Sequence, residues 1–305
     1  MSKLCLVTGA NGFIGNRLIQ PGDRRLVRDI ADKPGEVKGD LLDSDSLFRA
    51  CEGVGTIYHC AGYAHAFFSS DPGAHHRINY EGTRNLLKAA GDAGVSHFVY
   101  LSSVKAMAEP GENCVDEDWP GEPTTPYGLA KRAAENAVLE AGAKFGMHVV
   151  NLRLAMVYGN GGRGNLERMA RAIRAGWFPP LPETGNMRSL VHIQDVVDVV
   201  RLVAKRAEAN SKTYIVADSQ TYSTRELYLF LRTALGLSPE PLFTLPAGLF
   251  RAAGHVSSRF GEIVDRLMES SCYCPLRIEQ ELGWRARINL ENGLNEMLQT
   301  LGVNQ

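Results

Sequence analysis

Three glycines near the start of the chain constrain its fold more than any other feature. The apolar run Leu4–Val7 leads into Thr8-Gly9-Ala10-Asn11-Gly12-Phe13-Ile14-Gly15, where the glycines follow a G-x-x-G-x-x-G spacing. The run predicts a buried parallel strand, and the pattern after the turn predicts the start of a helix. Glycines alone can mark a purely structural turn. A glycine turn between a strand and a helix instead favours a dinucleotide site, because free N–H groups at a helix start bind phosphate.

Each glycine of this turn has an expected role. Gly9 allows the sharp turn, Gly12 lets a pyrophosphate approach the backbone, and Gly15 lets the helix pack closely on the strand. The other turn residues that we expect to contact the cofactor are Asn11, Phe13 and Ile14.

The composition indicates a soluble globular enzyme. The net charge of −1 over 305 residues argues against a nucleic-acid or membrane-surface partner. No apolar run is long enough to span a bilayer, and the direct entry into a strand leaves no room for a signal peptide. Because the six cysteines show no metal-binding spacing, we expect free thiols in a cytoplasmic protein and no metal site. The loop with His65, His75 and His76 lacks a carboxylate or cysteine to complete such a site.

Strand and helix patterns alternate along the first half of the chain. This alternation predicts an α/β fold with a Rossmann-type doubly wound parallel sheet. We expect a dinucleotide-binding domain over residues 1–160, to which later segments near 188–217 return, and a smaller, mainly C-terminal substrate-binding lobe over 161–305.

A serine pair and a tyrosine–lysine pair carry the predicted chemistry. Ser102 and Ser103 end a predicted strand, at the edge where open α/β sheets bind ligands. Tyr127 and Lys131 are four residues apart in a helical pattern and therefore share one face. A tyrosine is a poor base at neutral pH unless a neighbouring ammonium favours the phenolate. We expect Tyr127 to be the acid–base residue, Lys131 to support it and to bind the nicotinamide ribose, and one of the two serines to bind the substrate oxygen. The family resemblance described next favours Ser103 for this role, with Ser102 as the second choice.

The sequence resembles the extended short-chain dehydrogenase/reductase family of nucleotide-sugar epimerases and dehydratases. The glycine turn, the segment Pro126–Lys131 after a strand-end serine pair, and Glu281-Leu282-Gly283-Trp284 carry the resemblance, which runs from Leu4 to about Leu298. A Tyr-x-x-x-Lys pair alone is common on helix surfaces, but this combination favours the catalytic interpretation. The resemblance implies a nicotinamide dinucleotide cofactor and a nucleoside-diphosphate-sugar substrate.

The resemblance also implies further cofactor contacts. Asp40 and Leu41 match an adenine-contacting Asp-Leu pair, and Ala61 and Gly62 match a loop that lies over the pyrophosphate and ribose. Arg28 stands where members that use NAD carry an acidic residue. Both NAD and NADP stay open, with a lean to NADP because an arginine favours the 2′-phosphate. The alternative is that Arg28 is an ordinary surface charge.

Two residues match substrate ligands of the family. Asn165 follows a glycine-rich loop and corresponds to a nucleotide-diphosphate contact, and Arg188 corresponds to a diphosphate clamp for which a planar guanidinium is suited. Asp195 is expected to cap the helix that follows.

Three residue differences from the family's pattern reduce the number of reactions that we expect of this chain. Val104 and Lys105 replace the Asp-Glu pair of the dehydratases, which argues against a 4,6-dehydratase. Ala64 and Met156 stand where typical UDP-galactose epimerases carry Lys and Asn. The pattern is similar to a bacterial surface-polysaccharide subgroup of UDP-sugar 4-epimerases and 4-keto reductases.

We therefore expect NAD(P)-dependent oxidoreduction at C4, by a UDP-hexose or UDP-N-acetylhexosamine 4-epimerase. The alternative within the class is an NADPH-dependent UDP-4-keto-6-deoxy-sugar reductase. A 3β-hydroxysteroid-dehydrogenase-like enzyme is less consistent with Asn165 and Arg188, and a non-catalytic dinucleotide sensor would need neither Ser103 nor Tyr127. The family resemblance also implies a homodimer.

Overall fold

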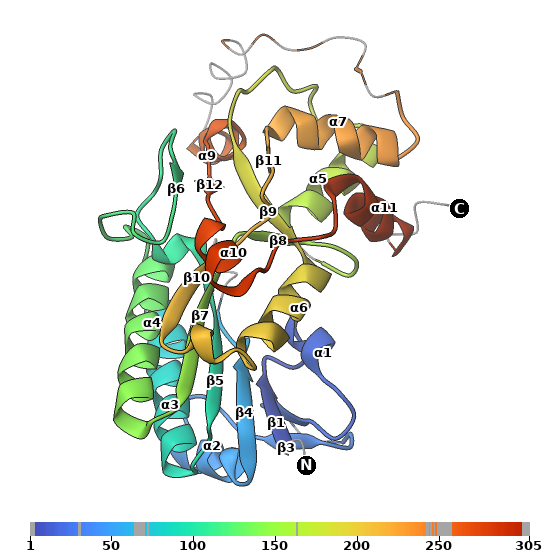
Figure 1. The fold of residues 1–305 in the computed structure, drawn as a ribbon. Helices are drawn as coiled ribbons and strands as arrows, with labels where there is room; N and C mark the ends of the chain where they lie inside the picture. The colour runs from blue at the N-terminus through green and yellow to red at the C-terminus, as the bar shows by residue number, and fades with distance from the viewer. Residues whose placement is uncertain are drawn as a thin grey trace.

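A seven-stranded parallel sheet forms the centre of the computed structural model (Figure 1). The structure describes residues 4–29, 32–63, 71, 73–162, 164–238, 240–241, 244, 246, 248 and 258–300. The strand order β10-β7-β5-β4-β1-β2-β3 confirms the predicted doubly wound sheet. Its strands are β1 (Leu4–Thr8), β2 (Arg24–Val27), β3 (Glu36–Lys38), β4 (Val54–His59), β5 (His97–Ser103), β7 (His148–Leu154) and β10 (Lys212–Val216).

Helices cover both faces of this sheet because the strand side chains alternate between two apolar clusters. Leu6, Phe98 and Val149 pack under one set of helices, whereas their neighbours Val7 and Val99 pack under the other. The first set is α2 (Ser44–Cys51), α3 (Gly82–Asp92) and α4 (Pro126–Phe145), and the second includes α1 (Gly15–Leu18), α6 (Ile193–Val203) and α10 (Leu276–Leu282). The π-helix η2 (His76–Glu81) and the 3-10 helices η3 (Val104–Ala106) and η4 (Ala207–Ala209) complete this part of the fold.

The order of the strands creates the position for a ligand. β1 lies between β2 and β4. From β1 the chain runs outward through β2 to β3, and it then crosses to β4 on the other side of β1, from which it continues to β5. The carboxyl ends of β1, β4 and β5 therefore meet at one edge, where open α/β sheets bind their ligands.

Above that edge lies a second group of elements (Figure 1). A three-stranded sheet of β8 (Met156–Tyr158), β9 (Arg188–His192) and β11 (Thr221–Tyr222) shares an apolar cluster with α5, α7, α9 and α11. Those helices are α5 (Asn165–Arg174), α7 (Thr224–Ala234), α9 (Ser258–Met268) and α11 (Leu290–Thr300). β10 lies at the edge of the main sheet, although it follows β9 in the chain.

The expectation that every cysteine is a free thiol is wrong for one pair. Cys114 and Cys272 form a disulfide across 158 residues of sequence, between the paired strands β6 (Cys114–Val115) and β12 (Cys272–Tyr273). Because disulfides are rare in reducing compartments, this bond argues against the compartment inferred from cysteine spacing. Among the residues that the structure describes, no helix is long and apolar enough to cross a membrane.

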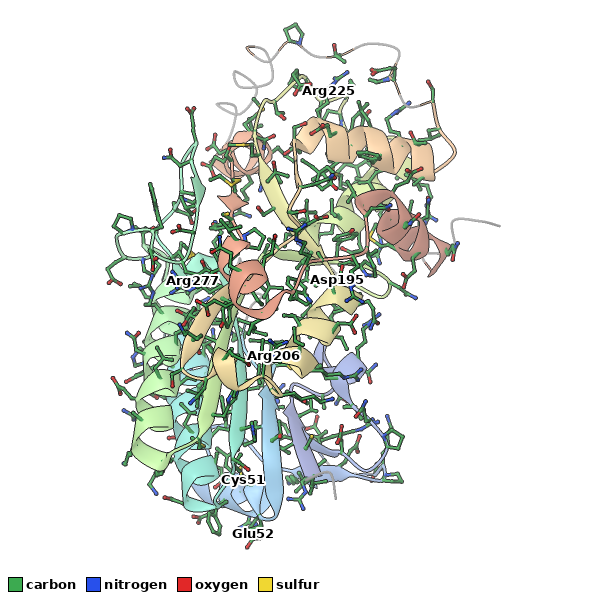
Figure 2. The ribbon with its side chains drawn as sticks, viewed as in Figure 1. Cys51, Glu52, Asp195, Arg206, Arg225 and Arg277 are labelled. Carbon is green, nitrogen blue, oxygen red and sulfur yellow. A yellow bond between two sulfur atoms is a disulfide. The ribbon has the colours of Figure 1, made fainter. Side chains whose placement is uncertain are left out.

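Asp195 has a different role from the predicted cap. His192 caps α6, and the Asp195 carboxylate instead accepts hydrogen bonds from the backbone N–H groups of Arg287 and Ile288, at 3.0 and 3.1 Å. In Figure 2 Asp195 lies at the level of the C-terminal segment that it binds. The carboxylate therefore anchors the start of α11 to the main domain.

Candidate active site

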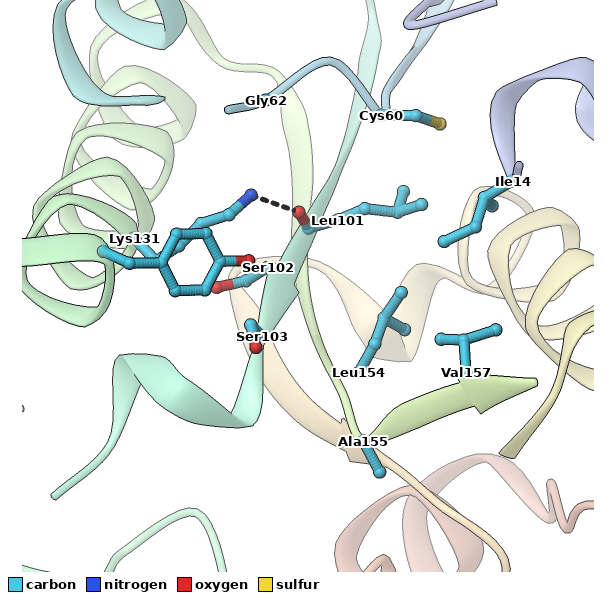
Figure 3. Close-up of a pocket in the computed structure, with 11 residues that line it drawn as sticks. Ile14, Cys60, Gly62, Leu101, Ser102, Ser103, Lys131, Leu154, Ala155 and Val157 are labelled. Carbon is cyan, nitrogen blue, oxygen red and sulfur yellow. Dashed lines mark hydrogen bonds between the residues drawn. The ribbon is translucent and has the colours of Figure 1, made fainter. Parts of the chain in front are cut away.

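Tyr127, Lys131 and Ser103 line one pocket at the carboxyl edge of the main sheet. The pocket has a volume of about 230 Å³, and its lining residues come from the β1 turn, the β4 loop, β5, α4 and the segment after β7 (Figure 3). They are Ile14, Cys60, Gly62, Leu101, Ser102, Ser103, Tyr127, Lys131, Leu154, Ala155 and Val157. Within the described ranges, no group of three or more His, Cys, Asp and Glu side chains could hold a metal ion.

Lys131 is buried, and its amino group is directed at the backbone of β5. Its Nζ donates to the carbonyl oxygen of Leu101 at 2.9 Å (Figure 3). The same atom lies 4.6 Å from the centre of the Tyr100 ring. Burial lowers the pKa of Lys131 to about 8, although the nearby Glu135 carboxylate favours the charged form. Lys131 is therefore still mostly protonated at neutral pH, although it is buried.

Tyr127 lies in the first turn of α4, which is capped by the Thr125 hydroxyl. Burial raises the pKa of Tyr127, and the Ser103 side chain acts in the opposite direction. The phenol is therefore neutral at physiological pH, and it can serve as an acid. To serve as a base it needs additional positive charge beside it.

The two serines that end β5 have different environments. Ser102 donates to Glu135 Oε1 at 2.6 Å, so its hydroxyl hydrogen is already used. Ser103 accepts from the backbone N–H of Lys105 at 3.2 Å, and its hydroxyl also hydrogen-bonds the Tyr127 phenol in the pocket. This geometry favours Ser103 as the substrate donor.

A buried ion pair supports the catalytic face of α4. Arg153, on β7, donates to both carboxylate oxygens of Glu135, with Nη2–Oε2 at 2.8 Å and Nε–Oε1 at 3.0 Å. Sequence reasoning missed Glu135, although its spacing from Lys131 repeats the four-residue step from Tyr127 to Lys131 and puts all three on one helix face.

A second buried chain of hydrogen bonds connects the glycine turn to the loop after β4. Thr83 donates to the Asn79 carbonyl and so accepts from His59 Nε2 at 2.9 Å, which leaves His59 Nδ1 to accept from Thr8 at 2.7 Å. Thr8 in turn accepts from the N–H of Ala61 at 3.1 Å. Burial lowers the pKa of His59 to about 3, so its ring is neutral.

The glycine turn has the close backbone contacts that its sequence suggested. A Cβ on Gly15 would lie 2.3 Å from the Gly9 carbonyl oxygen, and one on Gly9 would lie 2.7 Å from the nitrogen of Ala61. Asn11 and Gly12 are exposed, whereas Phe13 and Ile14 are partly buried. A cradle that only glycine can form, next to a helix start, fits a dinucleotide diphosphate.

Other predicted ligands lie outside the pocket lining. Arg28 is exposed just after β2, and the exposed Asp40 accepts from the N–H of Leu42 at 2.9 Å. Leu41 is buried under α3. The exposed Asn165 starts α5 in the second lobe. Arg188, at the start of β9, is partly buried, and this burial lowers its pKa against the effect of Glu269. Ala64 lies outside the described residues.

The family model for the NAD dependent epimerase/dehydratase family matches residues 5–217. The chain belongs to that family. As a member of the NAD dependent epimerase/dehydratase family, it has a Rossmann-like fold and belongs with NAD(P)-dependent enzymes.

Individual members of the family match over most of the chain. It is 29% identical to a UDP-glucose 4-epimerase of Vibrio cholerae, over 98% of this chain and 95% of the relative. It is 26% identical to an N-acetyl-alpha-D-glucosaminyl-diphospho-ditrans,octacis-undecaprenol 4-epimerase of Escherichia coli O157:H7, over 84% of this chain and 79% of the relative. A solved structure, MoeE5 in complex with UDP-glucuronic acid and NAD, is 25% identical with a TM-score of 0.77 and covers 99% of this chain and 100% of that one.

Proposed function

We propose that this protein is a UDP-hexose or UDP-N-acetylhexosamine 4-epimerase that uses a bound nicotinamide dinucleotide. The observation that carries the proposal is the convergence of Ser103, Tyr127 and Lys131 in one pocket beside the glycine turn. The similarity to two 4-epimerases supports the choice of C4 as the reacting position.

The residues have distinct roles in the proposed reaction. Ser103 donates a hydrogen bond to the oxygen on C4, and Tyr127 takes the proton from that hydroxyl and later returns it. The Lys131 ammonium favours the phenolate and binds the nicotinamide ribose. The bound oxidised cofactor supplies a hydride acceptor and a positive charge next to the phenol.

The cofactor site that we propose follows the β1, β2 and β4 edge. The glycine turn would hold the diphosphate, Asp40 and Leu41 would contact the adenine, and the loop with Ala61 and Gly62 would lie over the pyrophosphate and ribose. Arg28, exposed after β2, supports NADP over NAD.

The second lobe supplies the substrate contacts in this proposal. Asn165 and Arg188 bind the diphosphate of the nucleotide sugar, and the partial burial of the Arg188 guanidinium supports a charge-assisted contact. We propose that residues 1–160, with later segments near 188–217, form the dinucleotide-binding domain, and that residues 161–305 form most of the substrate-binding lobe. We also expect a homodimer that forms through α3 and α4. Leu129 on α4 is 48% exposed, and the mass of the protein in solution tests this expectation.

The test is to incubate the protein with NAD or NADP and with either UDP-glucose or UDP-N-acetylglucosamine, and to follow the anomeric proton signals by NMR. The proposal predicts the galacto epimer from at least one of the two. Tyr127→Phe is expected to bind NAD with unchanged affinity but form no epimer. Equal turnover by Tyr127→Phe would sink the assigned mechanism.

The second candidate is an NADPH-dependent 4-keto reductase, which the position of Arg28 favours. Denaturing the purified protein and assaying the released cofactor separates the two. About one retained dinucleotide per chain supports the epimerase, because an epimerase returns the hydride to the same sugar. A protein without retained cofactor that binds NADPH reversibly supports the reductase.

A further inference from the structure

His75 contacts the proposed acid–base residue but has no part in the mechanism described so far. It lies just before η2, and its ring meets the ring of Tyr127 nearly edge-on, with centroids 5.5 Å apart and planes at 68°. The side chain is partly buried. Aromatic pairs in this geometry stabilise a particular relative orientation of their rings.

The orientation of the His75 ring is itself fixed. Its Nδ1 lies 3.1 Å from the carbonyl oxygen of Tyr63 and 3.4 Å from Asn79 Nδ2. We assign the hydrogen to Nδ1, because the closer partner is a carbonyl, which only accepts, and because Asn79 Nδ2 already donates to that carbonyl. The ring also packs against Tyr63, with centroids 5.3 Å apart. Asn79 fixes the Tyr63 backbone, because its side chain accepts from the Tyr63 N–H at 2.6 Å and donates to the Tyr63 carbonyl at 3.1 Å.

We propose that His75 is a positioning residue for Tyr127. The Tyr63 carbonyl holds the imidazole, and the imidazole holds the phenol ring at the angle required for proton exchange with the sugar oxygen. This inference rests on the proposed function, since it assumes that Tyr127 transfers the proton. A phenol free to rotate at the start of α4 would lose turnover without losing either ligand.

The adjacent residue provides a matched control. His76 is an exposed histidine whose Nδ1 lies 3.3 Å from Glu81 Oε1. Its ring packs against Tyr80, with centroids 5.0 Å apart. A variant at this position changes the same turn of the chain and removes the same side-chain type, but it leaves the contact with Tyr127 intact.

Two substitutions separate the ring of His75 from its hydrogen bond. His75→Asn keeps a donor at the position of Nδ1 but removes the ring, whereas His75→Phe keeps a ring but removes the donor. His75→Ala removes both. If the ring is what positions Tyr127, His75→Asn and His75→Ala lose about tenfold or more in kcat, with KM and NAD affinity unchanged. His75→Phe then stays within about threefold of wild type, and His76→Ala is unaffected.

A second readout does not need turnover. In protein labelled with ¹³C at tyrosine Cζ, the Tyr127 signal, identified with Tyr127→Phe, is expected to be single and sharp in wild type and His75→Phe, and shifted or broadened in His75→Ala. Wild-type kcat in His75→Ala with an unchanged Tyr127 signal would overturn the inference. So would equal losses in the Phe and Ala variants. Failure of the proposed function itself would appear differently, as full turnover by Tyr127→Phe or no turnover of any UDP-sugar by wild type.

Discussion

Ser102 donates its hydroxyl hydrogen to the Glu135 carboxylate across 2.6 Å, and this bond separates the roles of two adjacent serines. Ser102 joins α4 to the end of β5, whereas the Ser103 hydroxyl lies in the pocket and hydrogen-bonds the Tyr127 phenol. Ser102 therefore has a structural role, and the adjacent Ser103 has the proposed catalytic role.

Exchanging each serine for alanine tests this division. Ser103→Ala is expected to lower kcat by roughly a hundredfold, because a donor to the reacting oxygen is lost. Ser102→Ala is expected to keep most of its turnover but to lose about 1–3 kcal/mol of unfolding free energy, since a buried carboxylate loses a hydrogen bond. Steady-state kinetics and urea unfolding of both variants check the prediction, and a larger kcat loss in Ser102→Ala would reverse the assignment.

Glu135→Gln is expected to destabilise the fold and weaken the site together. It leaves Arg153 buried beside a neutral amide, and breaking a buried pair costs about 3–5 kcal/mol. It also removes the carboxylate that favours the charged form of Lys131, so the pKa of Lys131 falls further. Glu140→Gln, at an exposed position of the same helix, is the control for urea unfolding. Similar unfolding free energies for both variants would contradict this account.

The buried His59 predicts a loss of stability in acid. Its pKa is about 3 in the folded protein and 6.5 for an ordinary imidazole, so the unfolded state binds more protons between these values. Stability therefore rises with pH through that window and falls as the pH drops below 6.5, by about 2 kcal/mol at pH 5.

The comparison with His59→Gln isolates this contribution. Between pH 7 and pH 5 the wild type is expected to lose more unfolding free energy than the variant, which has no imidazole to protonate. An independent check is the NMR titration of His59 in the wild type. Protonation of this ring near pH 6.5 in the folded protein would refute the prediction.

Arg28 predicts which dinucleotide the protein prefers. If it binds the 2′-phosphate, Arg28→Ala weakens NADPH binding by roughly tenfold or more and leaves NADH binding nearly unchanged, because only NADPH loses a charge-assisted contact. Fluorescence titration with each dinucleotide measures both affinities. Equal small changes for the two would mean that Arg28 is an ordinary surface charge.

Local patterns in the sequence were sufficient for the sheet and for the positions of the main side chains. The glycine spacing and the step from Tyr127 to Lys131 are short-range signals, and a parallel sheet brings strand ends together by rule. Glu135 could have been added on the same reasoning, because it continues the helix face.

Other features depend on contacts between distant segments. The roles of Ser102 and Ser103 differ only because Glu135 packs on one of them, and adjacent residues of one type give no sequence signal for this. The disulfide between Cys114 and Cys272 spans 158 residues, and Asp195 binds a backbone more than ninety residues away. Such pairings follow from how the second lobe lies on the sheet, which residue spacing does not encode.

Isotope labelling at the reacting carbon tests the central claim most directly. The protein is incubated with UDP-glucose or UDP-N-acetylglucosamine that carries deuterium at C4, and the products are analysed by NMR. The account predicts the C4 epimer with the deuterium retained at C4, formed by wild type and not by Tyr127→Phe. An epimer with solvent hydrogen at C4, equal formation by Tyr127→Phe, or no epimer from either sugar would contradict it.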